Sequence, residues 1–224
     1  MQPGSGQALL FDIDGTLADT DALHLEAFNR VFQPRGHIFD HARFTKELQG
    51  FSNASICERF FPDEPPECQA AIMAEKETAF RGLVSGKIRP VPGLMPLLTL
   101  ADRAGVPMVA VTNAPRLNAE MLLSGLGIMG RFKALIIGDE LAHGKPHPMP
   151  YLTGLRAACA APDRSLAFED SRSGIQSAAA AGIATVGIRT SLSHADMSAA
   201  GARMTADSFD DPELLRLVAA IMNW

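Results

Sequence analysis

Short runs of apolar residues recur along the chain and are separated by longer segments of mixed polarity. Each run is apolar at consecutive positions rather than at alternate ones, which is typical of strands buried on both faces of a parallel sheet. We therefore predict five strands, at Ala8–Phe11, Val106–Val111, Ala134–Ile137, Leu166–Phe168 and Ala184–Ile188.

Most segments between and after these runs repeat apolar residues at the spacing of a helix. Strands that alternate with helices form βαβ units, so the pattern predicts an α/β fold with a doubly wound parallel sheet. The helices expected around this sheet are Leu94–Ala104, Leu117–Leu126, Pro148–Ala158, Gly174–Ala181 and Asp211–Trp224.

The segment between the first two predicted strands breaks this alternation, because it is far longer than a βα connection needs. We predict a core domain of residues 1–19 and 90–224, with a helical cap domain, residues 20–89, inserted into it. A cap above the sheet edge would act as a lid, and a purely structural helical subdomain is the alternative. The helices expected in the cap are Thr20–Phe32, Ala42–Leu48, Asn53–Phe60 and Glu67–Leu83.

Composition and charge narrow the class of function. The chain has 224 residues, of which 47% are hydrophobic and 20% charged, so it can bury a core. Its 20 basic and 25 acidic residues give a formal net charge of −5. Without a basic run to neutralise phosphates, we expect no nucleic-acid partner and no membrane partner. A small anionic metabolite needs only a few local cations and stays open as the partner.

Cysteine usage and the absence of targeting patterns bear on the compartment. Cys57, Cys68 and Cys159 are odd in number and form no CxxC pair, so we expect neither a disulfide framework nor a zinc site. The first residues lack the pattern of a signal peptide, and no run approaches the ~20 apolar residues that span a bilayer. We expect a cytoplasmic protein, and a monomer, because the cap would cover the site within one chain.

Polar residues follow four of the predicted strands, directly or after a short connection. In an open parallel sheet ligands bind at the carboxyl ends of the strands, so these side chains are expected to meet at one edge. In chain order the residues are Asp12 and Asp14 in "FDIDGTL", Thr112 and Asn113 in "VTN", Lys145 in "GKPHP", and Glu169 and Asp170 in "FEDS".

Four carboxylates at one edge carry more negative charge than Lys145 can offset. Two unit charges ~4 Å apart repel by about 4 kcal/mol at an effective dielectric constant of 20. Either some of the acids are protonated or a divalent cation lies among them. Oxygen ligands without cysteine favour a hard ion, above all Mg²⁺, which usually binds one or two carboxylates together with substrate phosphate oxygens. The set therefore points to phosphoryl chemistry.

Two carboxylates one residue apart can divide this chemistry between them. One can attack phosphorus and form an acyl phosphate, while the other protonates the leaving oxygen and later deprotonates water. The metal, Lys145 and Thr112 would bind the phosphoryl oxygens as charge shifts.

These four motifs, in this order, resemble those of the haloacid dehalogenase superfamily, in the helical-cap branch that contains phosphoglycolate-phosphatase-like enzymes and β-phosphoglucomutase. The resemblance covers essentially the whole sequence. It implies that Asp12 is the nucleophile, Asp14 the acid/base, Thr112 a phosphate-binding residue and Lys145 the lysine of the third motif.

The same resemblance implies a magnesium site and further contacts to substrate. Asp12, the backbone carbonyl of Asp14 and Asp170 would bind Mg²⁺, and Glu169 would do so directly or through water. Thr16, with Gly15, would let the chain turn back towards the cap. Thr16 and Asn113 are therefore expected among the substrate-binding residues.

Two cap residues are expected to contact substrate. His24 stands where related mutases have a histidine near the leaving-group oxygen, although an ordinary surface histidine is equally open. Asn53, in "LQGFSNAS", stands where those mutases carry an arginine that holds a second phosphate. Its absence favours hydrolysis, unless Arg59, Lys76 or Arg81 supplies the cation instead.

We therefore expect a Mg²⁺-dependent phosphatase that hydrolyses a small phosphorylated metabolite through an aspartyl-phosphate. A β-phosphoglucomutase-type phosphosugar mutase is the alternative. A 2-haloacid dehalogenase ranks third, because that branch lacks the metal and the second aspartate, so Asp14 and Asp170 count against it.

Overall fold

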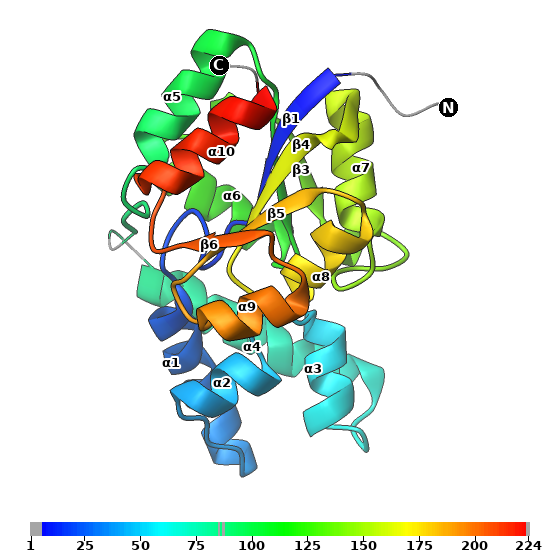
Figure 1. Ribbon diagram of the computed structural model, residues 1–224. Helices are drawn as coiled ribbons and strands as arrows, with labels where there is room; N and C mark the ends of the chain where they lie inside the picture. Colours follow the sequence, from blue (N-terminus) through cyan, green and yellow to red (C-terminus); the bar gives the residue numbers. More distant parts are fainter. Residues whose placement is uncertain (1–5, 85, 87, 223–224) are drawn as a thin grey trace.

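The computed structural model describes residues 6–84, 86 and 88–222, and a single parallel sheet forms its centre (Figure 1). The sheet has the strand order β3-β2-β1-β4-β5-β6, and every pairing in it is parallel. The first strand lies in the middle of the sheet, the second and third extend it to one edge, and the last three extend it to the other edge. The strands are β1 Gly6–Phe11, β2 Met108–Thr112, β3 Phe132–Ile137, β4 Ala160–Glu169, β5 Ala184–Ile188 and β6 Met204–Ala206.

The predicted α/β fold with a parallel sheet is confirmed, with two differences in its strands. β4 begins at Ala160, well before the apolar run at Leu166, because its first half is partly exposed and carries Asp163 and Arg164. β6 was not predicted, since its three residues form no apolar run and pair with β5 alone. Neither the partly exposed first half of β4 nor the short edge strand β6 needs a continuous apolar sequence.

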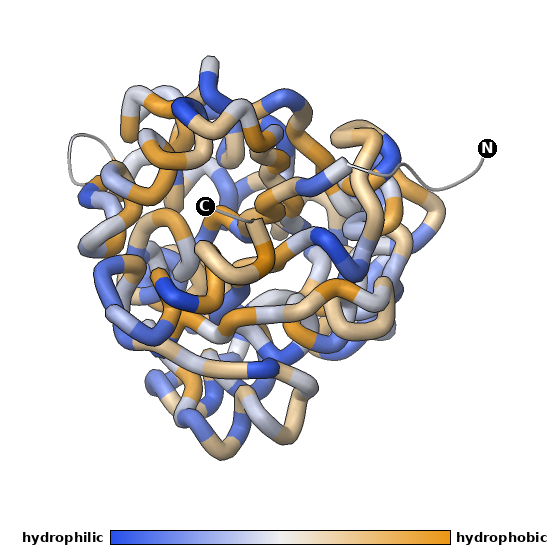
Figure 2. Tube along the Cα trace, turned by 45° about the horizontal axis from the view of Figure 1, so that its top comes forward, coloured by the Kyte–Doolittle hydropathy of each residue, from blue (hydrophilic) through white to orange (hydrophobic). Residues whose placement is uncertain are grey.

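Helices cover both faces of the sheet (Figure 1). The apolar sides of α5, α6 and α10 pack in one core cluster, and those of α7 and α8 pack in another on the opposite face. Hydrophobic and hydrophilic residues are interspersed along the helices, as the colours of Figure 2 show. The bounds are α5 Leu94–Ala104, α6 Arg116–Gly125, α7 Met149–Ala158, α8 Arg172–Ala180, α9 His194–Ala200 and α10 Pro212–Met222, with short 3₁₀ turns at Gln33–Arg35, Met129–Arg131 and Gly138–Glu140.

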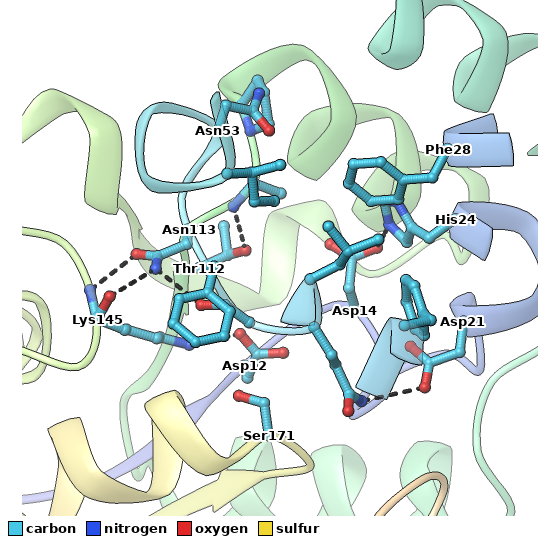
Figure 3. Close-up of a pocket in the computed structure, with 18 of the residues that line it drawn as sticks. Asp12, Asp14, Asp21, His24, Phe28, Asn53, Thr112, Asn113, Lys145 and Ser171 are labelled. Atoms are coloured by element: carbon cyan, nitrogen blue, oxygen red, sulfur yellow. Dashed lines mark hydrogen bonds and ion pairs between the residues drawn. The ribbon is translucent and has the colours of Figure 1, made fainter. Parts of the chain in front are cut away.

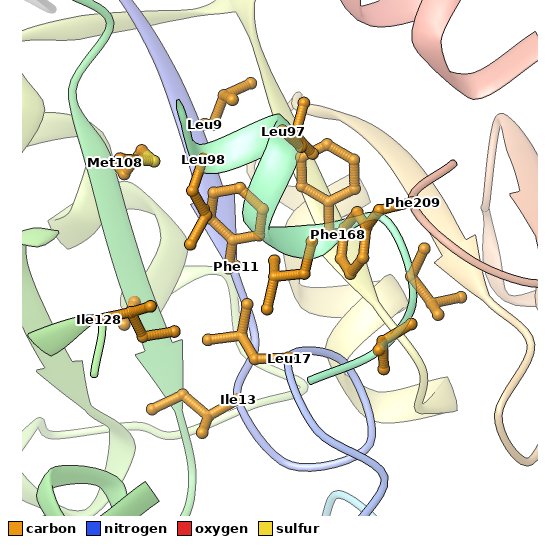
Figure 4. Close-up of a cluster of buried hydrophobic side chains, with 14 of the residues drawn as sticks. Leu9, Phe11, Ile13, Leu17, Leu97, Leu98, Met108, Ile128, Phe168 and Phe209 are labelled. Carbon is orange, nitrogen blue, oxygen red and sulfur yellow. The ribbon is translucent and has the colours of Figure 1, made fainter. Parts of the chain in front are cut away.

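Aromatic packing holds together the two strands that carry the acidic motifs (Figure 4). Phe11 of β1 stacks on Phe168 of β4 with ring centroids 4.7 Å apart, and Phe209 lies edge-on to Phe168 at 5.3 Å. All three rings are fully buried, which stabilises the fold by about 1.5–3 kcal/mol for each side chain. The residues that follow Phe11 and Phe168 are therefore fixed relative to each other.

Four of the five α-helices described between β1 and β2 lie at the carboxyl end of the strands (Figure 1). We call residues 21–84 the cap segment; the part between the helices contains turns and no strand. The segment that leaves the core and the segment that returns to it lie side by side, because Ala18 forms an antiparallel bridge with Pro90. The helices are α1 Asp21–Phe32, α2 His41–Glu47, α3 Asn53–Phe60 and α4 Pro66–Val84.

The cap segment has an apolar cluster of its own, separate from the two around the sheet. It is rich in phenylalanine, and Phe32 and Phe61 lie with ring centroids 5.0 Å apart. None of the described helices, in the cap segment or around the sheet, has the length and apolar character needed to cross a membrane.

Candidate active site

A cavity lies between the carboxyl end of the sheet and the cap segment (Figure 3). Most of the residues singled out in the sequence line it. From the core these are Asp12, Asp14, Thr112, Asn113, Lys145 and Asp170, and from the cap segment they are His24, Asn53 and Lys76.

The sharp turn after β1 explains the sequence "DIDGT". Asp12 continues the strand, its backbone N–H donating to Phe168 O at 3.0 Å. Gly15 has a φ of +77°, and a Cβ there would overlap the carboxylate of Asp170. Glycine is therefore required for the chain to turn this close to the acidic cluster.

Thr16 does not lie where a substrate-binding residue would. Its side chain is fully buried and outside the cavity lining, and its Oγ1 donates to Asp170 Oδ1 at 3.1 Å. The expectation of a substrate contact is corrected here, because the turn that aims Asp12 and Asp14 at the cavity points Thr16 inward. Its hydroxyl holds Asp170.

Lys145 occupies the centre of the acidic motifs. Its ammonium donates to Asp12 Oδ1 at 2.5 Å, to Glu169 Oε1 at 2.6 Å and to Val111 O at 2.7 Å, which uses all three N–H groups. Burial by itself would lower the pKa of Lys145, but the carboxylates of Asp12 and Glu169 outweigh it and raise that pKa. The lysine is therefore a fixed positive charge beside Asp12.

Thr112 is the last residue of β2 and Asn113 follows it, and the two make different contacts in the site. Thr112 is buried in the cavity wall, and its Oγ1 accepts from Ala114 N at 2.9 Å. Asn113 Oδ1 accepts from Lys145 N at 2.9 Å, and Nδ2 donates to Lys145 O and Gly50 O at 3.0 and 3.1 Å. Although it lines the cavity, the amide of Asn113 is engaged by the protein and fixes the loop that carries Lys145.

The carboxylates of Asp12, Glu169 and Asp170 form a buried cluster with ligand atoms within 4.8 Å of one another. Burial raises the pKa of Asp12 well above its usual value, against the opposing charge of Lys145. Burial, with the neighbouring carboxylates, does the same to Asp170. One ammonium among three buried carboxylates leaves uncompensated negative charge, so this all-oxygen cluster fits a hard divalent cation such as Mg²⁺.

The carboxylate of Asp14 is turned away from that cluster and towards the cap segment. Its Oδ1 accepts from Thr20 Oγ1 at 2.9 Å and lies 2.9 Å from His24 Nε2. Burial would raise the pKa of Asp14, but His24, Thr20 and Lys76 outweigh it and lower that pKa. Oδ2 is buried and has no hydrogen-bond partner among the described residues, so this oxygen is available to a ligand.

His24 is held on both sides, and its interpretation as an ordinary surface residue is wrong. Its ring stacks on Phe80 with centroids 3.7 Å apart, and its Nδ1 lies 3.0 Å from Lys76 Nζ. An ammonium can only donate, so Nδ1 is the acceptor and we assign the proton to Nε2, which donates to Asp14. A hydrogen-bonded chain therefore runs from the cap segment to Asp14.

One of the three candidate cations of the cap segment, Lys76, lines the cavity. Arg81 donates instead to Asn118 Oδ1 at 3.0 Å, and Arg59 lies over the ring of Phe60. Asn53 Nδ2 donates to Glu77 Oε1 at 3.0 Å. The cap side of the cavity thus combines one buried ammonium with neutral and acidic groups.

Several site residues were not found from the sequence. Tyr151 Oη donates to Glu169 Oε1 at 2.5 Å, and Gln49 Nε2 donates to Asp170 Oδ2 at 2.7 Å. Asp21 also lines the cavity. Tyr151 looks like an apolar position of its predicted helix, and Gln49 belongs to no motif, so only the fold brings them to the acidic cluster.

The fold and this cavity, with acids at the end of β1, define the class of protein to which the chain belongs. A family model of haloacid dehalogenase-like hydrolases matches residues 9–188. Protein CbbY of Rhodobacter capsulatus is 30% identical over 190 residues, which cover 80% of this chain and 84% of that protein. A phosphoglycolate phosphatase of Xylella fastidiosa is 30% identical over 177 residues, covering 79% and 77%.

Solved structures agree with these relatives. A crystal structure of a CbbY mutant from Rhodobacter sphaeroides in complex with xylulose-(1,5)-bisphosphate has a TM-score of 0.79 and 30% identity, and covers 91% of this chain and 95% of that one. The chain belongs to the haloacid dehalogenase-like hydrolase family.

Proposed function

We propose that the protein is a Mg²⁺-dependent phosphatase that hydrolyses the phosphomonoester of a small metabolite through an aspartyl-phosphate on Asp12. The observation that carries this proposal is the arrangement at the end of β1. Asp12 faces a fixed ammonium at 2.5 Å, and Asp14, two residues on, presents a free buried oxygen to the same cavity. A nucleophile and a proton-transfer group thus follow one buried strand, and the charge partner reaches the nucleophile from the loop before α7.

In the first step a carboxylate oxygen of Asp12 attacks phosphorus, and the bond between phosphorus and the ester oxygen breaks. Asp14 gives a proton to the departing oxygen through Oδ2. Lys145 holds Asp12 in place and offers its charge to the phosphoryl oxygens. Thr112, which lies in the cavity wall, would contact those oxygens as well.

In the second step a water molecule attacks phosphorus of the aspartyl-phosphate, and the bond between phosphorus and the Asp12 oxygen breaks. Asp14, now a carboxylate, takes the proton of the attacking water. Asp12, Asp170, Glu169 and the backbone carbonyl of Asp14 are the groups proposed to hold Mg²⁺, which would supply positive charge to the phosphoryl group when bound.

Asp14 needs two protonation states, and the cap segment is placed to control them. In the present arrangement His24 keeps its pKa low, which favours the carboxylate. When His24 moves away with the cap segment, Asp14 loses a donor and its pKa rises towards the ordinary value. We propose that residues 20–89 form a cap domain that opens and closes over the core.

The size of the cavity supports such movement. It encloses about 80 Å³, which is room for a handful of water molecules at about 10–15 Å³ each. A phosphorylated metabolite is larger than this free volume, and we propose that the cap segment opens to admit it. The adjacent crossings at Ala18 and Pro90 supply the hinge.

The relatives support a small phosphorylated substrate, and the cavity favours hydrolysis over a mutase reaction. The CbbY complex holds a sugar bisphosphate, and another relative is named for phosphoglycolate. A mutase must hold a second phosphate, but Asn53 is neutral and already donates to Glu77. Lys76, the remaining cation of the cap lining, is shared between His24 and Glu77.

Phosphate release from a panel of small phosphomonoesters, with Mg²⁺ and with EDTA, tests the proposal. Metal-dependent release by the wild type and none by Asp12→Asn is the expected result. Absence of release from every ester, together with conversion of β-glucose 1-phosphate only when glucose 1,6-bisphosphate is present, would identify a mutase instead.

A further inference from the structure

Gln49 carries a buried oxygen that has no partner. This residue, two positions beyond α2, is 8% exposed and lines the active-site cavity. Its Nε2 lies 2.7 Å from Asp170 Oδ2, 2.9 Å from Ser191 Oγ and 3.1 Å from Asp21 Oδ2. Two of these acceptors are carboxylates, so the nitrogen must face them and Oε1 must point elsewhere. Oε1 is buried without a hydrogen bond from any described residue.

An unpaired buried acceptor needs an explanation, because leaving one unsatisfied costs about 1–3 kcal/mol. Asp14 Oδ2 is a second such atom in the same cavity, and its proposed role in proton transfer accounts for it. The proposed reaction gives no such task to Gln49. Because Gln49 lines the cavity, a ligand is the natural source of the missing donor.

The cations of the cavity do not supply that donor. Lys145 donates its three N–H groups to other acceptors, and Lys76 donates to His24 and Glu77. The ligand group that donates to Oε1 should also carry no negative charge, because the amide of Gln49 lies beside two carboxylates. A ligand carboxylate at this position cannot donate and would be repelled. A neutral hydroxyl group meets both requirements.

We infer that Gln49 Oε1 accepts a hydrogen bond from a hydroxyl group of the substrate, so that Gln49 is a specificity-determining residue for hydroxylated phosphate esters. This inference rests on the proposed phosphatase function and narrows its substrate class. It favours phosphorylated polyols and sugars over carboxylated or purely alkyl esters. A site built to bind a hydroxyl rejects analogues that lack it, since its own polar group is then left unpaired.

Matched ester pairs isolate the hydroxyl contact. Glycerol 3-phosphate and propyl phosphate share chain length and phosphate but differ in their hydroxyls, and a pentitol 5-phosphate and pentyl phosphate form a longer pair. kcat/KM is measured for both pairs at saturating Mg²⁺ with the wild type and Gln49→Met. Gln176→Met, an exposed glutamine on α8 outside the cavity lining, is the control. Gln49→Asn, which keeps the amide but shortens the side chain, is the second variant.

We expect the wild type and the control to prefer the hydroxylated member of at least one pair by about tenfold or more. Gln49→Met should lose most of that preference, measured as the ratio of kcat/KM within each pair, with Gln49→Asn in between. An equal loss on both members, or a raised Mg²⁺ requirement with the preference intact, would overturn the inference and leave Gln49 as a support for Asp170. Lack of hydrolysis of any ester by the wild type would instead refute the proposed function, and the inference with it.

Discussion

His24 Nε2, on the first helix of the cap segment, lies 2.9 Å from Oδ1 of Asp14, on the core. The proposed acid/base thus contacts the part of the chain that we propose moves to admit substrate. Lys76 and Phe80 of α4 hold the imidazole in turn, at 3.0 Å and by stacking. We propose that cap position and proton transfer are coupled through this contact.

Replacement of His24 by Phe tests the coupling, because the ring can still stack on Phe80 but donates no hydrogen bond. We expect kcat/KM to fall by about tenfold or more for alkyl phosphates, because Asp14, which gives a proton to their leaving oxygen, loses the contact that orients it even as its pKa rises. For p-nitrophenyl phosphate the loss should stay below about threefold. Asp14→Asn should show the same dependence on the leaving group with a larger loss. Equal losses of kcat/KM on the two ester types would show that His24 has no part in proton transfer.

Asp170→Asn should weaken metal binding and stabilise the metal-free protein. The carboxylate is buried beside other acids, and its pKa is raised for that reason, so removing its charge relieves repulsion. We expect the Mg²⁺ concentration for half-maximal activity to rise at least about tenfold. A thermal melt in EDTA should show a higher midpoint than the wild type, with little further gain on adding Mg²⁺. A lower midpoint in EDTA would contradict the repulsion argument.

Tyr151→Phe removes the hydroxyl that donates to Glu169 at 2.5 Å and leaves the ring in the core. Groups that orient metal ligands typically change affinity by about 10–100-fold. We expect the Mg²⁺ requirement to rise within that range, and kcat at saturating Mg²⁺ to stay within about threefold of the wild type. Titration of activity with Mg²⁺ measures both. An unchanged requirement would show that Glu169 does not depend on this contact.

Glu77 links the cap segment to the core, its Oε2 accepting from Asn118 Nδ2 at 2.6 Å. Burial would raise the pKa of Glu77, but Lys76, His24 and Asn53 outweigh it and lower that pKa. A carboxyl whose folded pKa is lowered adds stability above its unfolded pKa of about 4.3 and loses it as pH falls.

Glu77→Gln is therefore expected to reduce the free energy of unfolding by about 1–3 kcal/mol at pH 7, and by less at pH 4. Urea unfolding at the two pH values measures the difference. Glu75→Gln is the control, since Glu75 forms an exposed pair with Arg35 and should change stability by less than about 1 kcal/mol. The same loss for Glu77→Gln at both pH values would show that its charge is not involved.

The sequence predicts best those site residues that come directly after an apolar run, at the end of a strand. Asp12, Lys145 and Asp170 were expected at one sheet edge because strand ends can be recognised from the apolar runs before them, and the structure brings them together in one cavity. Side-chain direction was less predictable. The turn at Gly15 sends Thr16 inward to Asp170, which no local pattern indicates.

Contacts between residues far apart in the chain could not be predicted from the sequence. Gln49 meets Asp170 over a separation of 121 residues, and Asn118 meets Glu77 through the packing of α6 on α4. Such pairs depend on how the cap segment sits on the core. Neither partner differs locally from an ordinary polar residue on a helix or loop.

Trapping the covalent intermediate tests the central claim most directly. p-Nitrophenyl phosphate needs no proton on its leaving group, so Asp14→Asn should still be phosphorylated but should hydrolyse the intermediate slowly. Quenching during turnover, reduction with borohydride and peptide mass spectrometry would then report which aspartate carried an acyl phosphate. The account predicts conversion of Asp12 to homoserine, in Asp14→Asn more than in the wild type. A burst of nitrophenol with Asp12 unmodified, or modification of another carboxylate, would contradict it.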